Sequence, residues 1–465
     1  MLPKLLLTAA LTFAVPAFAT AFTEIDTLSA GRAPLGGKSP QLDKRVTREY
    51  VRADGAAGYL YRPAQPSPKS RTALLVMHYA ADYTTLSVCG EMAQRGYSVL
   101  CMKNSGGTLD ERLLDVYASM QYLRSRIDVS QIVLWGHSGG ATLLSAYQMI
   151  AENGVQSCQG TEKIHPCPDY LQGMPKADGV IWADSNWGNA VMTVLSLDPA
   201  VKVQDNGLQI DQAFNLYNPA NGFNSQGNSN YPATFIQRFQ AGVAQRNNAL
   251  LNDAQIRLKN IEAGKDQFTD DAPFVVAGAG STGPNNKLFL QDTRLLARTK
   301  GQWPLIHKGG TQTVQIVHSV RPPRPISGLT ARLNLGAANT TVRGWLTDNA
   351  IRVNRNFSYD AEGVYGVDWT STYAATAGNV TQIRVPSLIL GMTGGYEFLA
   401  AELLYNQSPA KDKRLAFIEG ATHMYDTCAA CEKTPGQFGN TLTTLFDYAD
   451  KWLAAKERFN THPGK

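Results

Sequence analysis

Charge, basic clusters and long apolar runs are all scarce in this sequence. Charged residues make up only 17% of its 465 residues, the formal net charge is +5, and Lys and Arg never form a run of five. A strongly basic block is typical of proteins that bind nucleic acid or an anionic membrane surface, so we expect neither partner. Beyond residue 20 no apolar run reaches the length of about 18 residues that a membrane span needs. A small-molecule or polymer substrate is therefore the expected partner.

Motifs for metals and nucleotides are also missing from the sequence. No H-E-x-x-H occurs, and the glycine-rich stretch at residues 278–283 (GAGSTG) has neither the P-loop layout nor the dinucleotide-binding spacing. We therefore expect no metal ion and no cofactor.

The N-terminus has the pattern of an export signal. Residues 1–20 contain Lys4, then an apolar run at residues 5–18, and small residues typical of a cleavage site near the end. This pattern predicts a periplasmic or extracellular protein, in an oxidising compartment where cysteines can pair.

Six cysteines are available for pairing. Their positions leave several pairings open, and pairing between nearest neighbours is the simplest hypothesis. The candidate pairs are Cys89 with Cys101, Cys158 with Cys167, and Cys428 with Cys431. The last pair forms a C-x-x-C motif, for which zinc binding or redox chemistry is the alternative. The export signal and the lack of a second C-x-x-C favour a disulfide there.

Residues 131–147 (QIVLWGHSGGATLLSAY) carry the clearest functional pattern in the chain. The apolar run 132–135 predicts a buried strand, which breaks at Gly136 and is followed by a helical pattern. The turn reads GHSGG, the G-x-S-x-G pattern in which glycines allow a nucleophilic serine, here Ser138, to lie exposed on a sharp corner. In this stretch the chain resembles the α/β-hydrolase superfamily. A tight turn with a purely structural serine is the alternative.

Short buried strands alternate with helical segments on both sides of this turn. Such alternation predicts an α/β fold with a doubly wound, mostly parallel sheet, whose ligands bind outside the carboxyl ends of the strands. A hairpin that turns at Asp54-Gly55 is expected ahead of them. The expected strands are 72–78, 97–102, 132–135, 179–183, 386–391 and 414–418, and the expected helices are 87–95, 109–126, 396–405 and 441–456.

About 200 residues separate the fourth of these strands from the fifth, which is too many for a loop. A large cap insertion of mixed α and β structure is therefore expected to leave the sheet near Ala183 and return near Pro386. Because both points lie at the carboxyl ends of strands, the cap should cover the serine side. The predicted division is an export signal 1–20, an irregular arm 21–45, a first core part 46–185, the cap 186–384 and a second core part 385–465.

A serine hydroxyl needs a base to take its proton, and histidine titrates in the suitable range. The resemblance to α/β-hydrolases implies the order serine, acid, histidine, with the histidine after the last strand. His423, in the stretch EGATH, occupies that place. Glu397 is the predicted acid because it is the first carboxylate after strand 386–391. Asp184, at the end of strand 179–183, is the alternative.

The same resemblance implies two backbone donors for an oxyanion, one from Gly139 after the nucleophile and one from Tyr79 after the first strand. His137, beside the serine, and Trp187, just beyond the fourth strand, are the candidate substrate-binding residues. These residues predict an exported serine hydrolase that cleaves carboxylic esters through an acyl-enzyme with a Ser-His-Glu triad. An amidase, a peptidase or a C–C bond hydrolase with the same triad, or a non-catalytic binding member of the superfamily, are the alternatives.

Overall fold

The computed structural model of the chain describes residues 42–204, 207–279, 287–323, 337–455 and 458–459. The predicted export signal lies outside these residues, as does most of the predicted arm, 21–45. Every helix among the described residues is too short or too polar to cross a bilayer.

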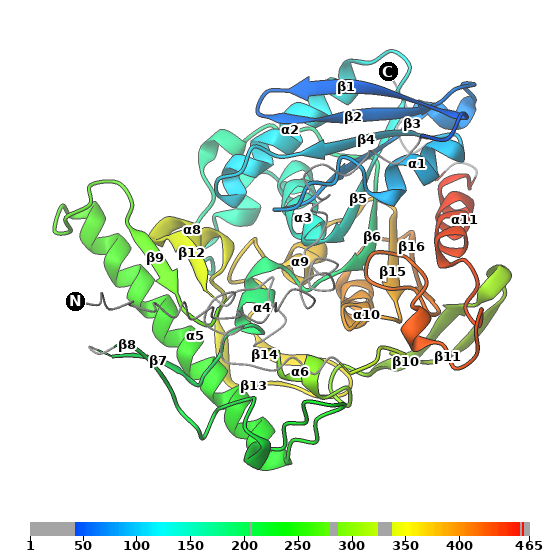
Figure 1. Cartoon of the computed structure of the whole chain (residues 1–465). Helices are drawn as coiled ribbons and strands as arrows, with labels where there is room; N and C mark the ends of the chain where they lie inside the picture. Colours follow the sequence, from blue (N-terminus) through cyan, green and yellow to red (C-terminus); the bar gives the residue numbers. More distant parts are fainter. Residues whose placement is uncertain (1–41, 205–206, 280–286, 324–336, 456–457, 460–465) are drawn as a thin grey trace, which may run out of the picture.

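A ten-stranded sheet forms the centre of the molecule (Figure 1). Its strands are, in chain order, β1 (Val46–Ala53), β2 (Ala56–Pro63), β3 (Thr72–Met77), β4 (Ser98–Lys103), β5 (Gln131–Ser138), β6 (Gly179–Ser185), β10 (Arg298–Ile306), β11 (Gln312–His318), β15 (Ser387–Met392) and β16 (Lys413–Ile418). Their spatial order is β1-β2-β4-β3-β5-β6-β15-β16-β10-β11. Seven neighbouring strands run parallel to one another, in the spatial order β4, β3, β5, β6, β15, β16 and β10. The outer pairs β1–β2 and β10–β11 are antiparallel. The predicted mostly parallel sheet and the hairpin at Asp54-Gly55 are both confirmed.

Helices cover both faces of this sheet (Figure 1). They are α1 (Ser87–Gln94), α2 (Leu109–Ser125), α3 (Gly139–Asn153), α10 (Phe398–Gln407) and α11 (Thr441–Leu453). Alternate residues of β3 belong to different cores: Leu74 and Val76 pack with residues of α1 and α11, whereas Leu75 and Met77 pack with residues of α2, α3 and α10. A strand that is buried on both faces must be apolar almost throughout, which is why the parallel strands appear in the sequence as continuous apolar runs.

The remaining α-helices and β-strands lie in the segment 186–384. Its helices are α4 (Asn189–Val194), α5 (Ala233–Glu262), α6 (Leu288–Gln291), α8 (Val342–Asp348) and α9 (Thr376–Asn379), and its small two-stranded sheets pair β7 (Val201–Gln204) with β8 (Gly207–Ile210), β9 (Pro273–Val276) with β12 (Ala338–Thr341), and β13 (Val353–Tyr359) with β14 (Val364–Val367). The same segment also supplies β10 and β11 to the central sheet, where Leu305 pairs with Phe417 of β16. The segment is therefore not separate from the core along its whole length, a point that the expected boundaries 186–384 did not allow for.

Three disulfides join nearest neighbours along the chain. They link Cys89 to Cys101, Cys158 to Cys167 and Cys428 to Cys431, and no free cysteine is found among the described residues. The first ties α1 to β4, while the other two close short loops. The nearest-neighbour pairing expected from the sequence is thus the one that the structure contains.

Candidate active site

Ser138 lies at the sharp corner where β5 ends and α3 begins. Its φ of +53° and ψ of −130° are unusual for a residue with a side chain and indicate local backbone strain. Glycines permit the close approaches around this corner, because a Cβ on Gly140 would lie 2.6 Å from the carbonyl oxygen of Met77. The strand, the strained turn and the helix are the structural setting that the G-x-S-x-G motif requires.

Asp184 lies next to this corner because of a bulge in the neighbouring strand, β6. His137 pairs with Ala183 and Ser138 pairs with Ser185, so Asp184 is the extra residue. Its φ of +50° is again unusual for a residue other than glycine. A bulge redirects the side chain of the extra residue, and here Oδ1 of the fully buried Asp184 accepts a hydrogen bond from the backbone N–H of Met392 at 2.8 Å.

His423 lies in the turn after β16, and its ring reaches the same place. Its Nδ1 is 2.7 Å from Oδ2 of Asp184. An ionised carboxylate has no proton to donate, so Nδ1 of His423 is the donor, and Nε2 is the bare nitrogen that can act as a base when the ring is neutral. The bridge between Ala421 and Thr427 closes the turn that holds the ring.

Glu397 approaches the same histidine from a second strand end, after β15. Its Oε2 is 4.0 Å from Nδ1 of His423, beyond hydrogen-bonding distance. The structure thus brings both candidate acids to His423, and Asp184, the alternative left open by the sequence, makes the hydrogen bond. Sequence reasoning had favoured Glu397 because it lies between the fifth strand and the histidine, and the bulge that redirects Asp184 is not visible in a strand pattern.

The two carboxylates dominate the electrostatics of this cluster. Burial lowers the pKa of His423, but the charges of Glu397 and Asp184 outweigh it and raise that pKa to about 9. Burial also raises the pKa of Asp184 to about 6, although the hydrogen bond to His423 opposes the change. The cluster therefore favours the imidazolium form of His423.

Two cations that the sequence did not single out lie near Glu397. Burial lowers the pKa of Lys287 to about 8, and the charge of Glu397 opposes this change. Burial likewise lowers the pKa of Arg321 to about 10 against the charge of Glu397. Both residues are far from the motifs in the chain, so no local pattern could have revealed them.

Oxygen or nitrogen atoms of Asp184, Glu397 and His423 all lie within 4.8 Å of one another, a spacing that could hold a metal ion. Both oxygens of Asp184 already accept hydrogen bonds, from Met392 and from His423. The proton on Nδ1 of His423 is donated to Asp184, so that nitrogen has no free lone pair for a metal. The hydrogen bond therefore fits a proton relay better than a ligand set.

The two predicted oxyanion donors lie close together, since a Cβ on Gly139 would lie 3.5 Å from the Cβ of Tyr79. Gly139 is the first residue of α3, where backbone N–H groups have no partner within the helix. Tyr79 lies in the loop after β3, and its hydroxyl donates to Asp348 while the guanidinium of Arg112 lies 4.0 Å from the centre of its ring. These two side-chain contacts hold in place the loop that carries the backbone N–H of Tyr79.

The two predicted substrate-binding residues are both buried. His137 is fully buried, with Nδ1 2.7 Å from the hydroxyl of Tyr83 and Nε2 2.7 Å from the carbonyl oxygen of His423. Burial lowers its pKa well below the ordinary value, so a neutral His137 supports the turn of His423. Trp187 is 1% exposed and belongs to the hydrophobic core. Neither side chain offers exposed surface to a substrate in this structure.

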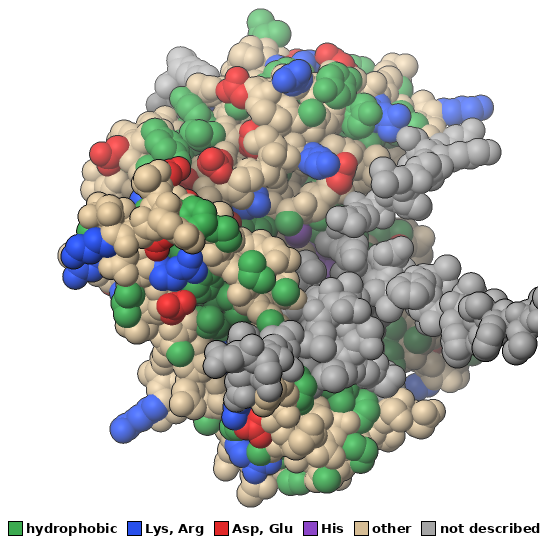
Figure 2. Space-filling view, turned by 60° about the vertical axis from the view of Figure 1, so that its left-hand side comes forward, with side chains coloured by type: hydrophobic (Ala, Val, Ile, Leu, Met, Phe, Trp, Pro, Cys, Tyr) green, Lys and Arg blue, Asp and Glu red, His purple; other side chains and the backbone are tan. Residues whose placement is uncertain are grey.

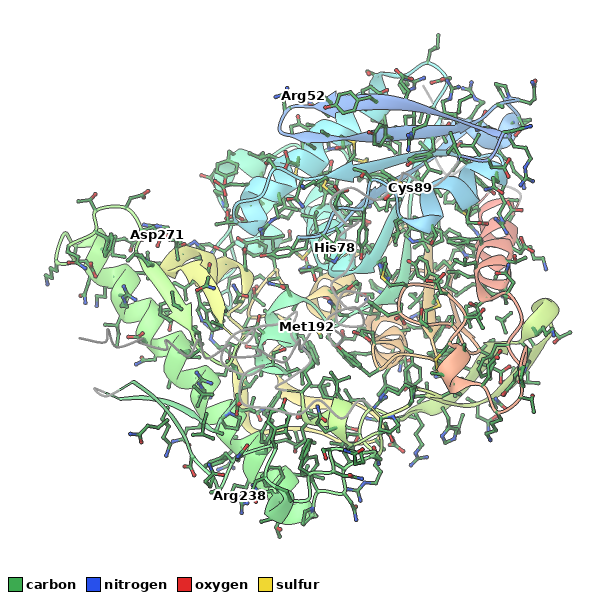
Figure 3. The ribbon with its side chains drawn as sticks, viewed as in Figure 1. Arg52, His78, Cys89, Met192, Arg238 and Asp271 are labelled. Atoms are coloured by element: carbon green, nitrogen blue, oxygen red, sulfur yellow. A yellow bond between two sulfur atoms is a disulfide. The ribbon has the colours of Figure 1, made fainter. Side chains whose placement is uncertain are left out.

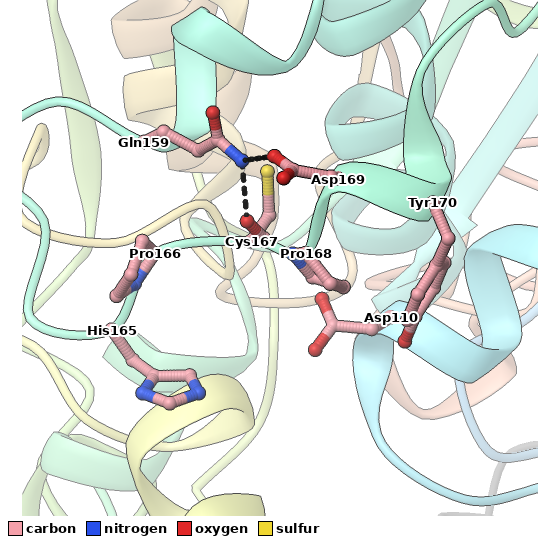
Figure 4. A pocket seen from close by; sticks show the side chains of 8 residues that line it. All are labelled: Asp110, Gln159, His165, Pro166, Cys167, Pro168, Asp169 and Tyr170. Atoms are coloured by element: carbon pink, nitrogen blue, oxygen red, sulfur yellow. Dashed lines mark hydrogen bonds between the residues drawn. The ribbon is translucent and has the colours of Figure 1, made fainter.

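Histidine side chains are visible in a recess on one face of the molecule (Figure 2). An open pocket of about 540 Å³ lies elsewhere, and its lining is Asp110, Gln159, His165, Pro166, Cys167, Pro168, Asp169 and Tyr170 (Figure 4). Several of its polar groups already bond one another, as Gln159 does with Asp169. None of these lining residues belongs to the cluster at Ser138, so we do not place the chemistry in this pocket.

No protein-family model matches the sequence, and no curated protein is detectably similar to it. Solved structures are similar to it at low identity. A hypothetical protein from Pseudomonas aeruginosa is 13% identical, with 90% of this chain and 95% of that chain covered and a TM-score of 0.38. Est1E from Butyrivibrio proteoclasticus is 11% identical, with 87% and 97% covered and a TM-score of 0.37. Esterase B from Lactobacillus rhamnosis, inhibited by a tributyrin phosphonate, is 10% identical, with 92% and 91% covered and a TM-score of 0.36.

An esterase is thus among the solved structures that resemble this chain. Because the TM-scores are low, the likeness adds no detail of the site. The sheet order and the strand, turn and helix around Ser138 are features of this chain itself and do not depend on that likeness.

Proposed function

We propose that this chain, an α/β-hydrolase by its core, is a serine hydrolase that cleaves carboxylic esters. The observation that carries the proposal is the hydrogen bond of 2.7 Å between His423 and Asp184, at the edge of the sheet where Ser138 lies on a strained turn. A histidine held by a buried carboxylate beside such a serine is the arrangement that activates a hydroxyl for acyl transfer.

In the proposed reaction, Oγ of Ser138 attacks the ester carbonyl carbon while Nε2 of His423 takes the hydroxyl proton. The negative charge on the carbonyl oxygen is stabilised by the backbone N–H groups of Gly139 and Tyr79. The imidazolium then gives its proton to the leaving alcohol as the C–O bond breaks, which leaves an acyl-enzyme. Water, activated by the same imidazole, releases the acid and restores Ser138.

The acid in this proposal is Asp184 rather than Glu397. A hydrogen bond at Nδ1 fixes which ring nitrogen carries the proton, whereas a charge at 4.0 Å acts only through its field. Glu397 instead acts through its charge, which favours the imidazolium that forms during the reaction.

We also infer that the protein is exported and that part of 186–384 covers the site. Disulfides persist in oxidising compartments, so three of them fit the predicted export. Asp348 of α8 accepts hydrogen bonds from the side chain of Tyr79 and from the backbone N–H of Leu109. Ser319 donates to the carbonyl oxygen of Gly395 in the turn that carries Glu397. These contacts favour a cover over the Ser138 edge.

The test is covalent labelling by a fluorophosphonate, which reacts with an activated serine. Wild-type protein and the control Ser225→Ala, at an exposed serine, should be labelled at Ser138, and Ser138→Ala should not. Ser138→Ala should also lower kcat for a p-nitrophenyl ester by about 10⁴-fold or more. Absence of labelling in the wild type would instead favour a binding protein. Labelling without ester turnover would favour an amidase, a peptidase or a C–C bond hydrolase.

A further inference from the structure

His78 is a buried histidine beside the site that the proposed mechanism does not use. It follows β3 directly, and its Nδ1 accepts hydrogen bonds from the backbone N–H groups of Ala80 at 3.0 Å and Ala81 at 2.7 Å. An atom that accepts from two N–H groups must carry a lone pair and no proton. The loop after β3 therefore determines which nitrogen of this ring is bare.

The remaining ring nitrogen of His78 must then carry a proton. Burial, together with the positive charges of His423 and Arg112, lowers the pKa of His78 to about 3, so the ring is neutral near pH 7. A neutral imidazole has one proton, and with Nδ1 bare that proton is on Nε2. Nε2 is buried and has no hydrogen-bond partner within the described part of the chain. Buried donors nearly always have an acceptor, so an unpartnered one requires an explanation.

The position of this donor supplies the explanation. A Cβ on Gly139 would lie 3.0 Å from Nε2 and 3.3 Å from Cε1 of His78. The protonated edge of the ring therefore lies against the residue that follows Ser138. Figure 3 places His78 in the middle of the molecule, away from the outer faces where Arg238 and Asp271 lie. The Nε2–H of His78 therefore lies beside Gly139, the residue whose backbone N–H is the predicted oxyanion donor.

We propose that the Nε2–H of His78 is a side-chain donor of the oxyanion hole. A carbonyl oxygen held by the Gly139 N–H would lie beside this edge of the ring, and it would be the acceptor that the buried donor lacks. The inference rests on the proposed function, because it requires an oxyanion at Ser138. A neutral donor fixed by two backbone contacts needs no reorganisation as the charge develops, which is the property that makes such donors effective.

Two substitutions separate this role from a structural one. In His78→Asn the amide oxygen can replace Nδ1 as the acceptor for Ala80 and Ala81, but nothing replaces the Nε2–H. In His78→Gln the amide nitrogen can reach the place of Nε2. We expect His78→Asn to lower kcat by about 10²- to 10³-fold with little change in KM, since the bond forms in the transition state. His78→Gln should recover part of the loss. His318→Asn, at an exposed histidine of β11, is the matched control and should behave as the wild type.

A second readout follows the oxyanion itself. A trifluoromethyl ketone forms a tetrahedral adduct with a reactive serine, so its inhibition constant in each variant should rise in parallel with the loss of kcat/KM. A merely structural role predicts no such correlation. In the wild type, NMR should show the Nε2–H proton of His78 moving downfield when the adduct forms, and this measurement does not depend on the folding of any variant.

The outcomes distinguish the two proposals. If fluorophosphonate fails to label wild-type protein, both the hydrolase and the oxyanion role of His78 are overturned. If the wild type is labelled but His78→Asn turns over esters as the wild type does, the role of His78 alone is overturned. The same holds if the Nε2–H resonance is unchanged in the adduct.

Discussion

Two strand ends each present a carboxylate to His423, and they do so in different ways. The end of β6 carries a single bulged residue, Asp184, which is fully buried and lies 2.7 Å from Nδ1. The turn after β15 is longer and ends at Glu397, which is 8% exposed and lies 4.0 Å from the same atom. The short side chain makes the hydrogen bond, and the long one contributes charge. The comparison indicates that the role of a carboxylate depends on its hydrogen bond rather than on its order in the chain.

The surroundings of the two carboxylates differ as well. Asp184 is held at both oxygens, by Met392 and His423, so its geometry leaves little freedom. Glu397 faces the charges of Lys287 and Arg321 as well as that of His423. We therefore expect loss of Asp184 to disturb the orientation of the imidazole, and loss of Glu397 to disturb its pKa.

The largest effect is expected from Asp184→Asn. An amide can donate to Nδ1, which would place the ring proton on Nε2 and leave no base for Ser138; the expected loss of kcat is about 10⁴-fold. The measurement is the kcat for a p-nitrophenyl ester at the plateau of the pH profile. Asp253→Asn, at an exposed position of α5, is the matched control. If Glu397→Gln proved the more damaging of the two, the acid role would pass to Glu397.

A smaller effect, on pH dependence, is expected from Glu397→Gln. The base acts as the neutral imidazole, so kcat/KM should rise with pH through the pKa of His423, which is about 9. Removing the charge of Glu397 disfavours the imidazolium, lowers that pKa and moves the rising limb to lower pH. The plateau value should fall less than about tenfold, because the hydrogen bond to Asp184 remains. A limb that stays in place or moves to higher pH would contradict the role assigned to Glu397.

Features that depend on a local pattern were predictable from the sequence. The strand, turn and helix around Ser138 follow from residues close together in the chain, as does the place of His423 after the last strand. The acid was harder to choose, because the bulge at Asp184 is a property of the pairing between β5 and β6. The participation of β10 in the central sheet was missed for a related reason, since its residues alternate between exposed and buried and gave no continuous apolar run.

The roles of buried polar residues were beyond the sequence altogether. His137 lies within the motif and Trp187 follows the fourth strand closely, yet both are buried in the protein. His78 is the last residue of the expected strand 72–78, and only the two hydrogen bonds at Nδ1 reveal its protonation. Adjacency in the chain therefore does not indicate which side chain faces a substrate.

The smallest effect is expected from Gly395→Ala, which probes the space between the two carboxylates. A Cβ at this position would lie 3.3 Å from Oε2 of Glu397 and 3.8 Å from Oδ2 of Asp184. The first contact is tight and the second is ordinary, so the flexible glutamate should yield by a few tenths of an ångström while the aspartate stays. At an effective dielectric constant of about 20, such a shift changes the interaction of two charges about 4 Å apart by roughly 0.3 kcal/mol, or less than about twofold.

We therefore expect the plateau kcat of Gly395→Ala to stay within about twofold of the wild type, with the pH profile displaced less than in Glu397→Gln. The matched control is Gly90→Ala in α1, where a Cβ would meet nothing within 4 Å. If Glu397 held the imidazole by a directional bond, a displacement of this size would disturb catalysis far more than a change in field does. A loss of about tenfold or more in kcat, with melting temperature unchanged, would show that orientation at Glu397 matters and would remove the distinction between the two carboxylates.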